Sequence, residues 1–248
     1  TILPNEKLGV NDTGIDRSQG VPYPTEKVSF KFPTLQTATL SNGAKVVLAQ
    51  RKGVPLVEMN FQFNFGYAQE DNDELGYTNF MMDMLNEGTK KYSSLQFDEA
   101  LDSLGSNLGF GSGLDTSYAT VSTLKANLSE TLDLAREALI NPTFPQKEID
   151  RIKKQTLASI VQEENRPAAI AYRNIGKLLY GENHPYGKPL TGSGISETID
   201  DITRDGVIAV HSRAINPSNL TFAVAGDIEL DELVEILEDK FGDWSSNT

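Results

Sequence analysis

The chain has 248 residues, 38% of them hydrophobic and 23% charged, a composition typical of a globular domain with a sizeable core. Its formal net charge is −13, from 35 acidic and 22 basic residues, and such an acidic surface repels nucleic acid and anionic membranes. No apolar run approaches the roughly 18 residues that a membrane span requires. We therefore expect no nucleic acid among the partners and no membrane insertion.

The residue types that most often build reactive or metal sites are scarce. There is no cysteine, which excludes disulfides, thiolate metal sites and cysteine nucleophiles. The two histidines, His184 and His211, are too few for a histidine-rich metal site, and neither stands in a serine-hydrolase motif. We predict a structural turn residue at His184 and a surface or partly buried packing residue within a helix at His211.

The N-terminal part differs in composition from the rest. Residues 1–25 are polar and contain glycine and proline, which predicts a linker or an extended arm. The first residue is not methionine, which we interpret as a segment of a longer polypeptide, and no signal peptide is visible. Residues 26–248 are expected to form a single α+β domain, opening with an alternating strand over 27–32.

Strand patterns follow. Asn42-Gly43 lies between the β-prone runs 37–40 and 44–49, a strong hairpin signal because both residues tolerate positive φ. Strict alternation over 56–65 predicts a strand with one buried face. Further strands are expected over 106–110, 116–124 and 220–225.

Helical spacing of apolar residues alternates with these strands in blocks. We expect helices over 75–86 with Gly88 as its stop, 94–104, from an Asn127 or Ser129 cap to 140, 146–165, 168–179, from a Thr203 cap to 213, and 229–241. The order of elements predicts an α+β fold whose sheet is mostly antiparallel and flanked by helices.

Seven short motifs, in this order, carry a family resemblance. They are LSNGAKV at 40–46, GYAQE at 66–70, GYTNFMMDMLNEGT at 76–89, LDSLG at 101–105, NPTF at 141–144, HPYG at 184–187, and the stretch 216–227. Each motif is weak alone, but the ordered set resembles the pitrilysin/insulinase family of zinc metallopeptidases, which includes mitochondrial processing peptidase. The resemblance covers roughly residues 34–244 and implies a mitochondrial processing peptidase-like domain.

The resemblance also implies where a zinc site would stand. Active members carry His-x-x-Glu-His on one helix, in which the histidines bind zinc and the glutamate activates a water molecule, and a later glutamate completes the ligands. These four positions fall on Asn79, Met82, Asp83 and Ser159 of this chain. A neutral amide, a thioether, one carboxylate and a hydroxyl do not make a catalytic zinc site. We therefore predict no catalytic, cofactor-binding or metal-binding residues, and no peptidase activity of this domain alone.

Other acids could in principle replace the lost ligands. Asp73, Glu74, Asp83, Glu163 and Glu164 would suit a hard cation such as Ca²⁺ or Mg²⁺. The competing interpretation, which we favour, is that they are solvated acids on helix faces and first turns. In the same region, Met81 and Met84 are expected to pack in the core.

The glycine-rich run 105–113 lacks the Gly-Lys-Ser/Thr of a phosphate loop and predicts a strand with close backbone approach. In the resembled family the corresponding strand lies near the cleft, and peptides pair with the sheet edge there. Pairing of this kind needs exposed backbone rather than particular side chains, so peptide binding near Phe110 could survive the loss of catalysis.

Family members are built from similar domains in two halves that close around a chamber, and one half is often degenerate. The resemblance implies that this chain is the first domain of a degenerate half, which helps form the peptide-binding chamber and contacts a catalytic half carrying zinc and an intact His-x-x-Glu-His. The parent would be a metalloendopeptidase, by analogy in a bacterial periplasm or envelope. The alternative is a pure scaffold or protein-interaction domain, as in respiratory-complex core subunits. An enzyme with new chemistry lacks a convincing nucleophile–base pair.

Overall fold

The computed structural model describes residue 20, residue 29 and residues 32–245. Contacts divide the chain into two units, residues 1–32 and residues 33–248. The arm expected over 1–25 and the strand expected over 27–32 fall on residues that, apart from Gly20, Ser29 and Phe32, lie outside the described part.

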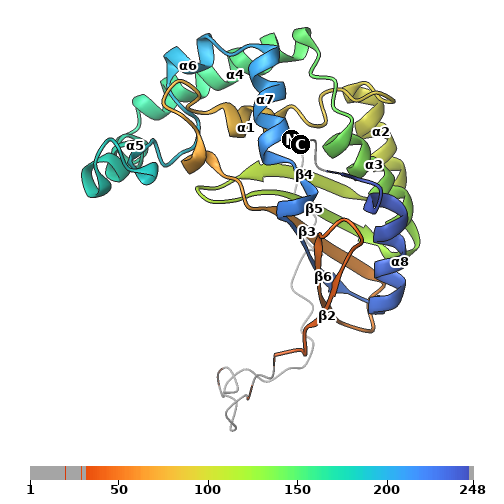
Figure 1. The fold of residues 1–248 in the computed structure, drawn as a ribbon. Helices are drawn as coiled ribbons and strands as arrows, with labels where there is room; N and C mark the ends of the chain where they lie inside the picture. Colours follow the sequence, from red (N-terminus) through yellow and green to blue (C-terminus); the bar gives the residue numbers. More distant parts are fainter. Residues whose placement is uncertain (1–19, 21–28, 30–31, 246–248) are drawn as a thin grey trace, which may run out of the picture. The chain divides into compact units, whose positions relative to one another are not determined.

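Within the described residues, six strands form one sheet in the order β1-β2-β6-β3-β5-β4 (Figure 1). They are β1 Gln36–Thr39, β2 Lys45–Gln50, β3 Leu56–Phe63, β4 Asn107–Ser112, β5 Ser117–Leu124 and β6 Leu220–Gly226. All neighbours are antiparallel except β2 and β6, which are parallel. The expected α+β fold with a mostly antiparallel sheet is confirmed.

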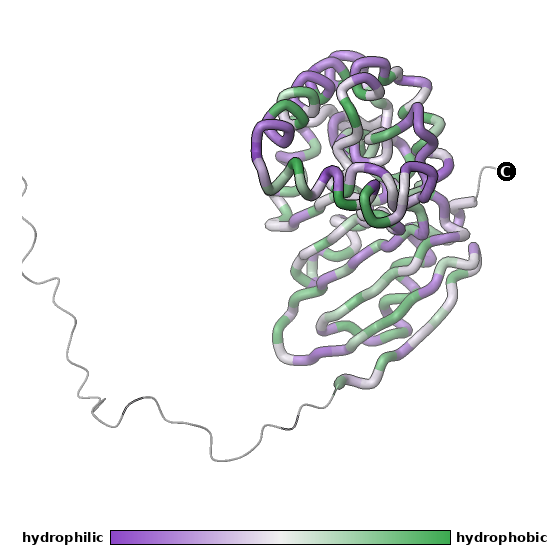
Figure 2. The backbone as a smooth tube through the Cα atoms, turned by 90° about the vertical axis from the view of Figure 1, so that its left-hand side faces the viewer, coloured by the Kyte–Doolittle hydropathy of each residue, from purple (hydrophilic) through white to green (hydrophobic). Residues whose placement is uncertain are grey.

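One face of this sheet is buried and the other is open. In β3, Val57, Met59 and Phe61 are buried whereas Glu58 and Gln62 are exposed, as the alternation predicted. Hydrophobic and hydrophilic residues alternate along the strands in Figure 2. Because successive side chains point to opposite faces of the sheet, this alternation determines which face packs against the helices.

The helices gather on one side of the sheet (Figure 1). They are α1 Tyr77–Asp83, α2 Ser94–Leu104, α3 Leu128–Ile140, α4 Gln146–Glu164, α5 Pro167–Tyr180, α6 Ser196–Asp200, α7 Arg204–Ala214 and α8 Leu230–Phe241. Short 3-10 turns occupy η1 Tyr67–Gln69, η2 Lys125–Asn127, η3 Pro185–Gly187 and η4 Pro217–Asn219. None of the helices in the described ranges combines the length and the apolar character needed to cross a bilayer.

One predicted helix boundary was wrong. Gly88 does not stop α1, which already ends at Asp83; Gly88 instead forms a bridge with Ser93. The predicted start of α3 at Asn127 is confirmed, but the Asn127 side chain does not cap the helix and donates instead to the carbonyl oxygen of Leu104 at 2.8 Å. The expected cap by Thr203 on α7 is confirmed.

The core joins the sheet to α8 through aromatic rings. Phe61 of β3 lies 4.7 Å from Phe222 of β6 and 5.6 Å from Phe241 of α8, both in edge-to-face geometry. All three side chains are fully buried. Burial of each ring stabilises the fold by roughly 1.5–3 kcal/mol, so this cluster fixes α8 against the central strands.

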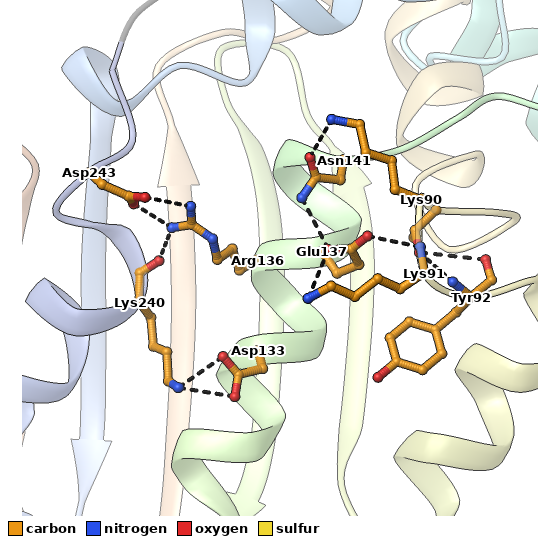
Figure 3. A network of polar contacts seen from close by, with 10 residues as sticks. Lys90, Lys91, Tyr92, Asp133, Arg136, Glu137, Asn141, Lys240 and Asp243 are labelled. Atoms are coloured by element: carbon orange, nitrogen blue, oxygen red, sulfur yellow. Dashed lines mark hydrogen bonds and ion pairs between the residues drawn. The ribbon is translucent and has the colours of Figure 1, made fainter.

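A polar layer ties α3 to its neighbours (Figure 3). Arg136 forms a two-pronged ion pair with Asp243 at 2.6 and 2.9 Å. The next residue, the buried Glu137, accepts hydrogen bonds from the backbone nitrogen of Lys91 at 3.1 Å and from Asn141 Nδ2 at 3.0 Å. These contacts hold the segment after α1 and the C-terminal segment on opposite sides of α3.

His211 gives the fold a specific acid sensitivity. Burial lowers the pKa of His211 below its ordinary value, while its Nε2 lies 2.9 Å from the carbonyl oxygen of Leu139. Because the unfolded chain then binds the proton more readily, the free energy of unfolding should fall as pH drops below about 6.5. We expect His211→Gln, which keeps an N–H for Leu139, to flatten this dependence. Urea midpoints between pH 5 and 7.5 measure it, and parallel curves for both proteins would contradict it.

Candidate functional site

The start of α1 is held by a buried carboxylate. Glu70 is 5% exposed and accepts hydrogen bonds from the backbone nitrogens of Gly76 at 2.9 Å and Thr78 at 2.6 Å. Burial raises the pKa of Glu70, although these backbone donors oppose the shift. The first N–H groups of a helix lack partners within the helix, so Glu70 supplies the acceptors that α1 needs.

Glycine allows close approach at this point. Gly76 adopts φ 95°, and a Cβ there would lie 2.8 Å from the carbonyl oxygen of Ser193. The loop around Ser193 is therefore pressed against the first turn of α1. Lys188 secures its other end by donating to the carbonyl oxygens of Ala68, at 2.9 Å, and Glu70.

His184 has a structural role. Its Nδ1 accepts a hydrogen bond from the backbone nitrogen of Tyr186 at 3.0 Å, and its ring stacks on Tyr180 at 5.0 Å. The predicted turn residue is confirmed. His211 packs edge-on against the buried Phe144, at 5.5 Å, as a helical packing residue.

A cleft of about 540 Å³ opens between α1, α4 and the loop around Ser193. Its walls are made by Gly76, Asn79, Phe80, Asp83, Glu87, Arg151, Ile152, Gln155, Thr156, Ser159, Glu163, Thr191 and Ser193. Asn79, Asp83 and Ser159, three of the four positions at which the resemblance places the zinc site, thus come together. Met82 does not line the cleft: it is fully buried in the core with Met81 and Met84.

Asn79 is packed rather than free. Its Oδ1 accepts a short hydrogen bond from Ser112 Oγ of β4. A Cβ at Gly192, where φ is 71°, would lie 2.2 Å from Asn79 Nδ2. The amide therefore fills the space between the sheet edge and the loop that covers α1.

Asp83 stands in a different environment. Part of its side chain is open to solvent, yet desolvation by the cleft walls, and secondarily the charge of Glu87, raise the pKa of Asp83 to about 6. Within residues 32–245, no hydrogen bond or ion pair engages the Asp83 carboxylate. It is a partly desolvated anion without an internal counter-charge.

The neighbouring acids are paired. Glu87 lies 2.5 Å from Arg151, and Glu163 lies 2.6 Å from Arg173 and 2.8 Å from Ser193 Oγ. Glu74 pairs with Arg213. The interpretation of the acids as solvated helix-face residues was therefore wrong for Glu74 and Glu163, which join different elements, and it holds for the exposed Asp73 and Glu164.

Arg173 was not singled out by the sequence. This side chain, 9% exposed, reaches from α5 to Glu163 of α4, to Ser193 Oγ at 2.8 Å and to the carbonyl oxygen of Gly194 at 2.8 Å. The contacting residues are up to 21 positions apart in the sequence, so no local sequence pattern predicts these contacts. Glu70, by contrast, falls in the stretch 66–70 that carries the family resemblance.

A second, larger cavity of about 850 Å³ lies beside η1 and η3. Two of its acids are already engaged, since Asp115 accepts from the Tyr186 hydroxyl at 2.7 Å and Glu182 pairs with Lys177. The first cleft, which collects the positions assigned to catalysis, is the better candidate site.

The edge strand β4 borders the helical side of the site. Gly113 N donates to Thr116 O at 2.7 Å, which fixes the alternation of the β4–β5 ladder. Every second residue back from Gly113, namely Gly111, Gly109 and Asn107, therefore points its backbone N–H and C=O toward β5. The residues between them, Leu108, Phe110 and Ser112, point these groups away from β5. β4 has no strand beyond it within the described residues.

Side chains, rather than the backbone approach that we expected, occupy the space beside the glycines of β4. A Cβ at Gly111 would lie 2.6 Å from the Tyr118 hydroxyl, and one at Gly109 would lie 3.0 Å from Thr120 Oγ1. The close approach is therefore made by side chains of β5, not by backbone.

The donor set does not fit zinc. Asn79 offers an amide that is already bonded, Asp83 one carboxylate and Ser159 a hydroxyl. A catalytic zinc site uses three strong protein donors. In the part of the chain that the structure describes, no group of three His, Cys, Asp or Glu side chains is placed to hold a metal ion.

Solved structures share this architecture. A peptidase M16 inactive domain from Pseudomonas fluorescens aligns with TM-score 0.81 and 27% identity, covering 86% of this chain and 52% of that one. The periplasmic protease PqqL from Escherichia coli aligns with TM-score 0.77 and 21% identity, over 86% of this chain and 24% of that one. The fold is therefore that of a peptidase M16-type domain.

Sequence comparison fixes the family. Residues 45–193 match the insulinase (peptidase family M16) model, and residues 201–248 match the peptidase M16 inactive domain. The chain belongs to the insulinase family, peptidase family M16.

Relatives within it have different names. An uncharacterized zinc protease of Rickettsia felis is 25% identical over 82% of this chain, and the non-peptidase homolog YmxG of Helicobacter pylori is 24% identical over 83%. Each alignment covers 48% of the relative, so the chain spans about half the length of these proteins.

Glu70 should be essential to the position of α1. We expect Glu70→Gln to lower the free energy of unfolding by about 1–3 kcal/mol, because an amide nitrogen would then face a backbone N–H inside the protein. Urea denaturation measures the loss. Asp71→Asn, on the exposed neighbour, is the control and should change stability by less than about 0.5 kcal/mol. Equal effects of both variants would contradict the assigned role.

Zinc content tests the donor argument. After dialysis against micromolar zinc we expect the purified chain to retain far less than one zinc ion. The triple variant Asn79→His, Asp83→His, Ser159→Glu should retain about one, since it restores three donors in the same cleft. Atomic absorption measures both. One tightly held zinc in the unchanged chain would show that the donor argument is wrong.

Proposed function

We propose that this chain is a non-catalytic domain of a zinc metallopeptidase assembly. It helps to form the peptide-binding chamber and contacts a catalytic half that carries zinc and an intact His-x-x-Glu-His motif. By itself it does not cleave peptides. The observation that carries the proposal is the combination of a retained cleft with lost donors: Asn79, Asp83 and Ser159 meet where the family's ligands would stand.

Peptide binding is supported by the sheet edge. Leu108 and Phe110 turn their side chains toward the hydrophobic core and their free backbone groups outward. A peptide strand added there would gain main-chain hydrogen bonds independent of metal chemistry. Ser112, on the same strand, contacts Asn79, so such a peptide would run past the cleft.

Contact with a partner is supported by α5. This helix exposes large apolar side chains, among them Leu178, 81% exposed, and Leu179, 68% exposed. Ile170, Tyr172, Ile175 and Tyr180 are also between 41% and 54% exposed. Apolar surface concentrated on one helix marks interaction sites. The relatives' twofold greater length is consistent with a further part of the assembly that covers it.

The same surface would serve a pure scaffold, the alternative function. The chamber role requires peptide binding, whereas the scaffold role does not. The chamber role also requires a catalytic half, so an intact His-x-x-Glu-His motif should be encoded in the same gene or operon. By analogy with the periplasmic protease PqqL, the assembly would lie in the periplasm or cell envelope of a bacterium.

Peptide binding should depend on the outward backbone of β4. We expect Phe110→Pro to weaken binding of extended peptides at least roughly fivefold, because proline removes an outward N–H and leaves the β4–β5 ladder intact. Fluorescence anisotropy with labelled, acetylated decapeptides of valine, threonine and serine measures it.

Phe110→Ala is the matched control, since it also loses the ring yet keeps the N–H. It should bind within about twofold of the unchanged chain. Equal binding by both variants would show that peptides do not pair with β4. If the unchanged chain binds no peptide, the scaffold function is favoured instead.

A further inference from the structure

We propose that the cleft left by the lost ligands receives a basic side chain of the bound peptide, with Asp83 as its counter-charge. This inference rests on the peptide-binding role proposed above and names the residue that sets its specificity. Asp83 stands at the position of the family's second zinc-binding histidine, and in this proposal its role is to recognise a lysine or arginine side chain.

The charge balance of the cleft carries the argument. Arg151 is neutralised by two carboxylates, Glu87 at 2.5 Å and Glu148 at 2.6 Å, and Arg173 is neutralised by Glu163 at 2.6 Å. Glu163 is further bonded to Ser193, 2.8 Å away. Asp83 is the carboxylate of the cleft wall that has no hydrogen-bond or ion-pair partner among residues 32–245. The two arginines and four carboxylates sum to a net charge of −2, so the cleft attracts a cation.

Asp83 differs in this respect from an ordinary surface acid. The walls desolvate its carboxylate enough to raise its pKa to about 6, so the folded chain keeps an anion at neutral pH at some cost. An entering ammonium or guanidinium group would offset that cost, and its attraction is stronger in such a partly desolvated site than in open water.

The shape of the cleft suits a long basic side chain. Phe80 and Ile152 contribute buried apolar wall, along which the methylene stem of lysine can lie. The hydroxyls of Thr156 and Ser159 and the amide of Gln155 line the same space and can accept hydrogen bonds from the charged end. A volume of about 540 Å³ accommodates one such side chain together with water.

The position relative to the sheet edge explains how the side chain would arrive. Asn79 and Asp83 lie one turn apart on α1, and Asn79 touches Ser112 of the edge strand. A peptide paired with β4 would direct every second side chain to the helical side of the sheet, where α1 lies. Basic residues should therefore be preferred at one or two alternate positions of the peptide, not along its whole length.

The test uses the decapeptides described above, with lysine moved one position at a time and norleucine as its uncharged counterpart. The unchanged chain should bind lysine roughly three- to tenfold more tightly than norleucine at one or two alternate positions. Asp83→Asn should abolish this preference, and Asp83→Lys should replace it with a preference for glutamate. Asp231→Asn, an exposed acid at the start of α8, should leave it unchanged.

The outcomes separate the two proposals. Binding of every peptide with no preference for lysine, or a preference that persists in Asp83→Asn, overturns this inference alone. Failure of the unchanged chain to bind any peptide overturns the chamber role and this inference with it. Circular dichroism of the Asp83 variants checks that they fold, and the double comparison of lysine with norleucine cancels effects common to both peptides.

Discussion

The carboxylate of Glu70 is the contact on which the candidate site depends. α1 has seven residues, too few for a helix to persist on its own, and its first N–H groups need acceptors. Glu70 supplies them, and Gly76 lets the loop around Ser193 press against the same turn. The direction of α1, and hence the place of Asn79 and Asp83, follows from this buried anchor rather than from helix propensity.

Much of the fold could be predicted because its signals are local. Asn42-Gly43 specifies a tight antiparallel connection whatever surrounds it, and β1 and β2 pair accordingly. Strict alternation marks β3 because one face of the sheet is buried. Local patterns do not specify that β6, the last strand in sequence, lies between β2 and β3. They also miss α6, whose five residues span little more than one turn.

The site divides in the same way. Resemblance placed Asn79, Asp83 and Ser159 together although Ser159 is far away in sequence, and the cleft brings them together. It did not foresee that Met82 turns into the core, because a thioether at that position gains more from burial than from facing an open cleft. Nor did it find Arg173, whose partners lie on other elements and depend on how α4, α5 and the covering loop pack.

Residues that stabilise the fold and residues at the family's zinc-ligand positions contribute to stability in different ways. Glu70, Gly76 and Arg173 stabilise the fold, so their loss would cost stability whether or not a metal binds. Zinc ligands contribute to folding only through the metal, so replacing them leaves the scaffold intact. Asp83 fits neither class, since within residues 32–245 its carboxylate makes no hydrogen bond or ion pair, and the cleft walls raise its pKa to about 6. An unpaired carboxylate at the cleft leaves its charge available to a group from outside the domain, and the proposed basic peptide side chain has the matching sign.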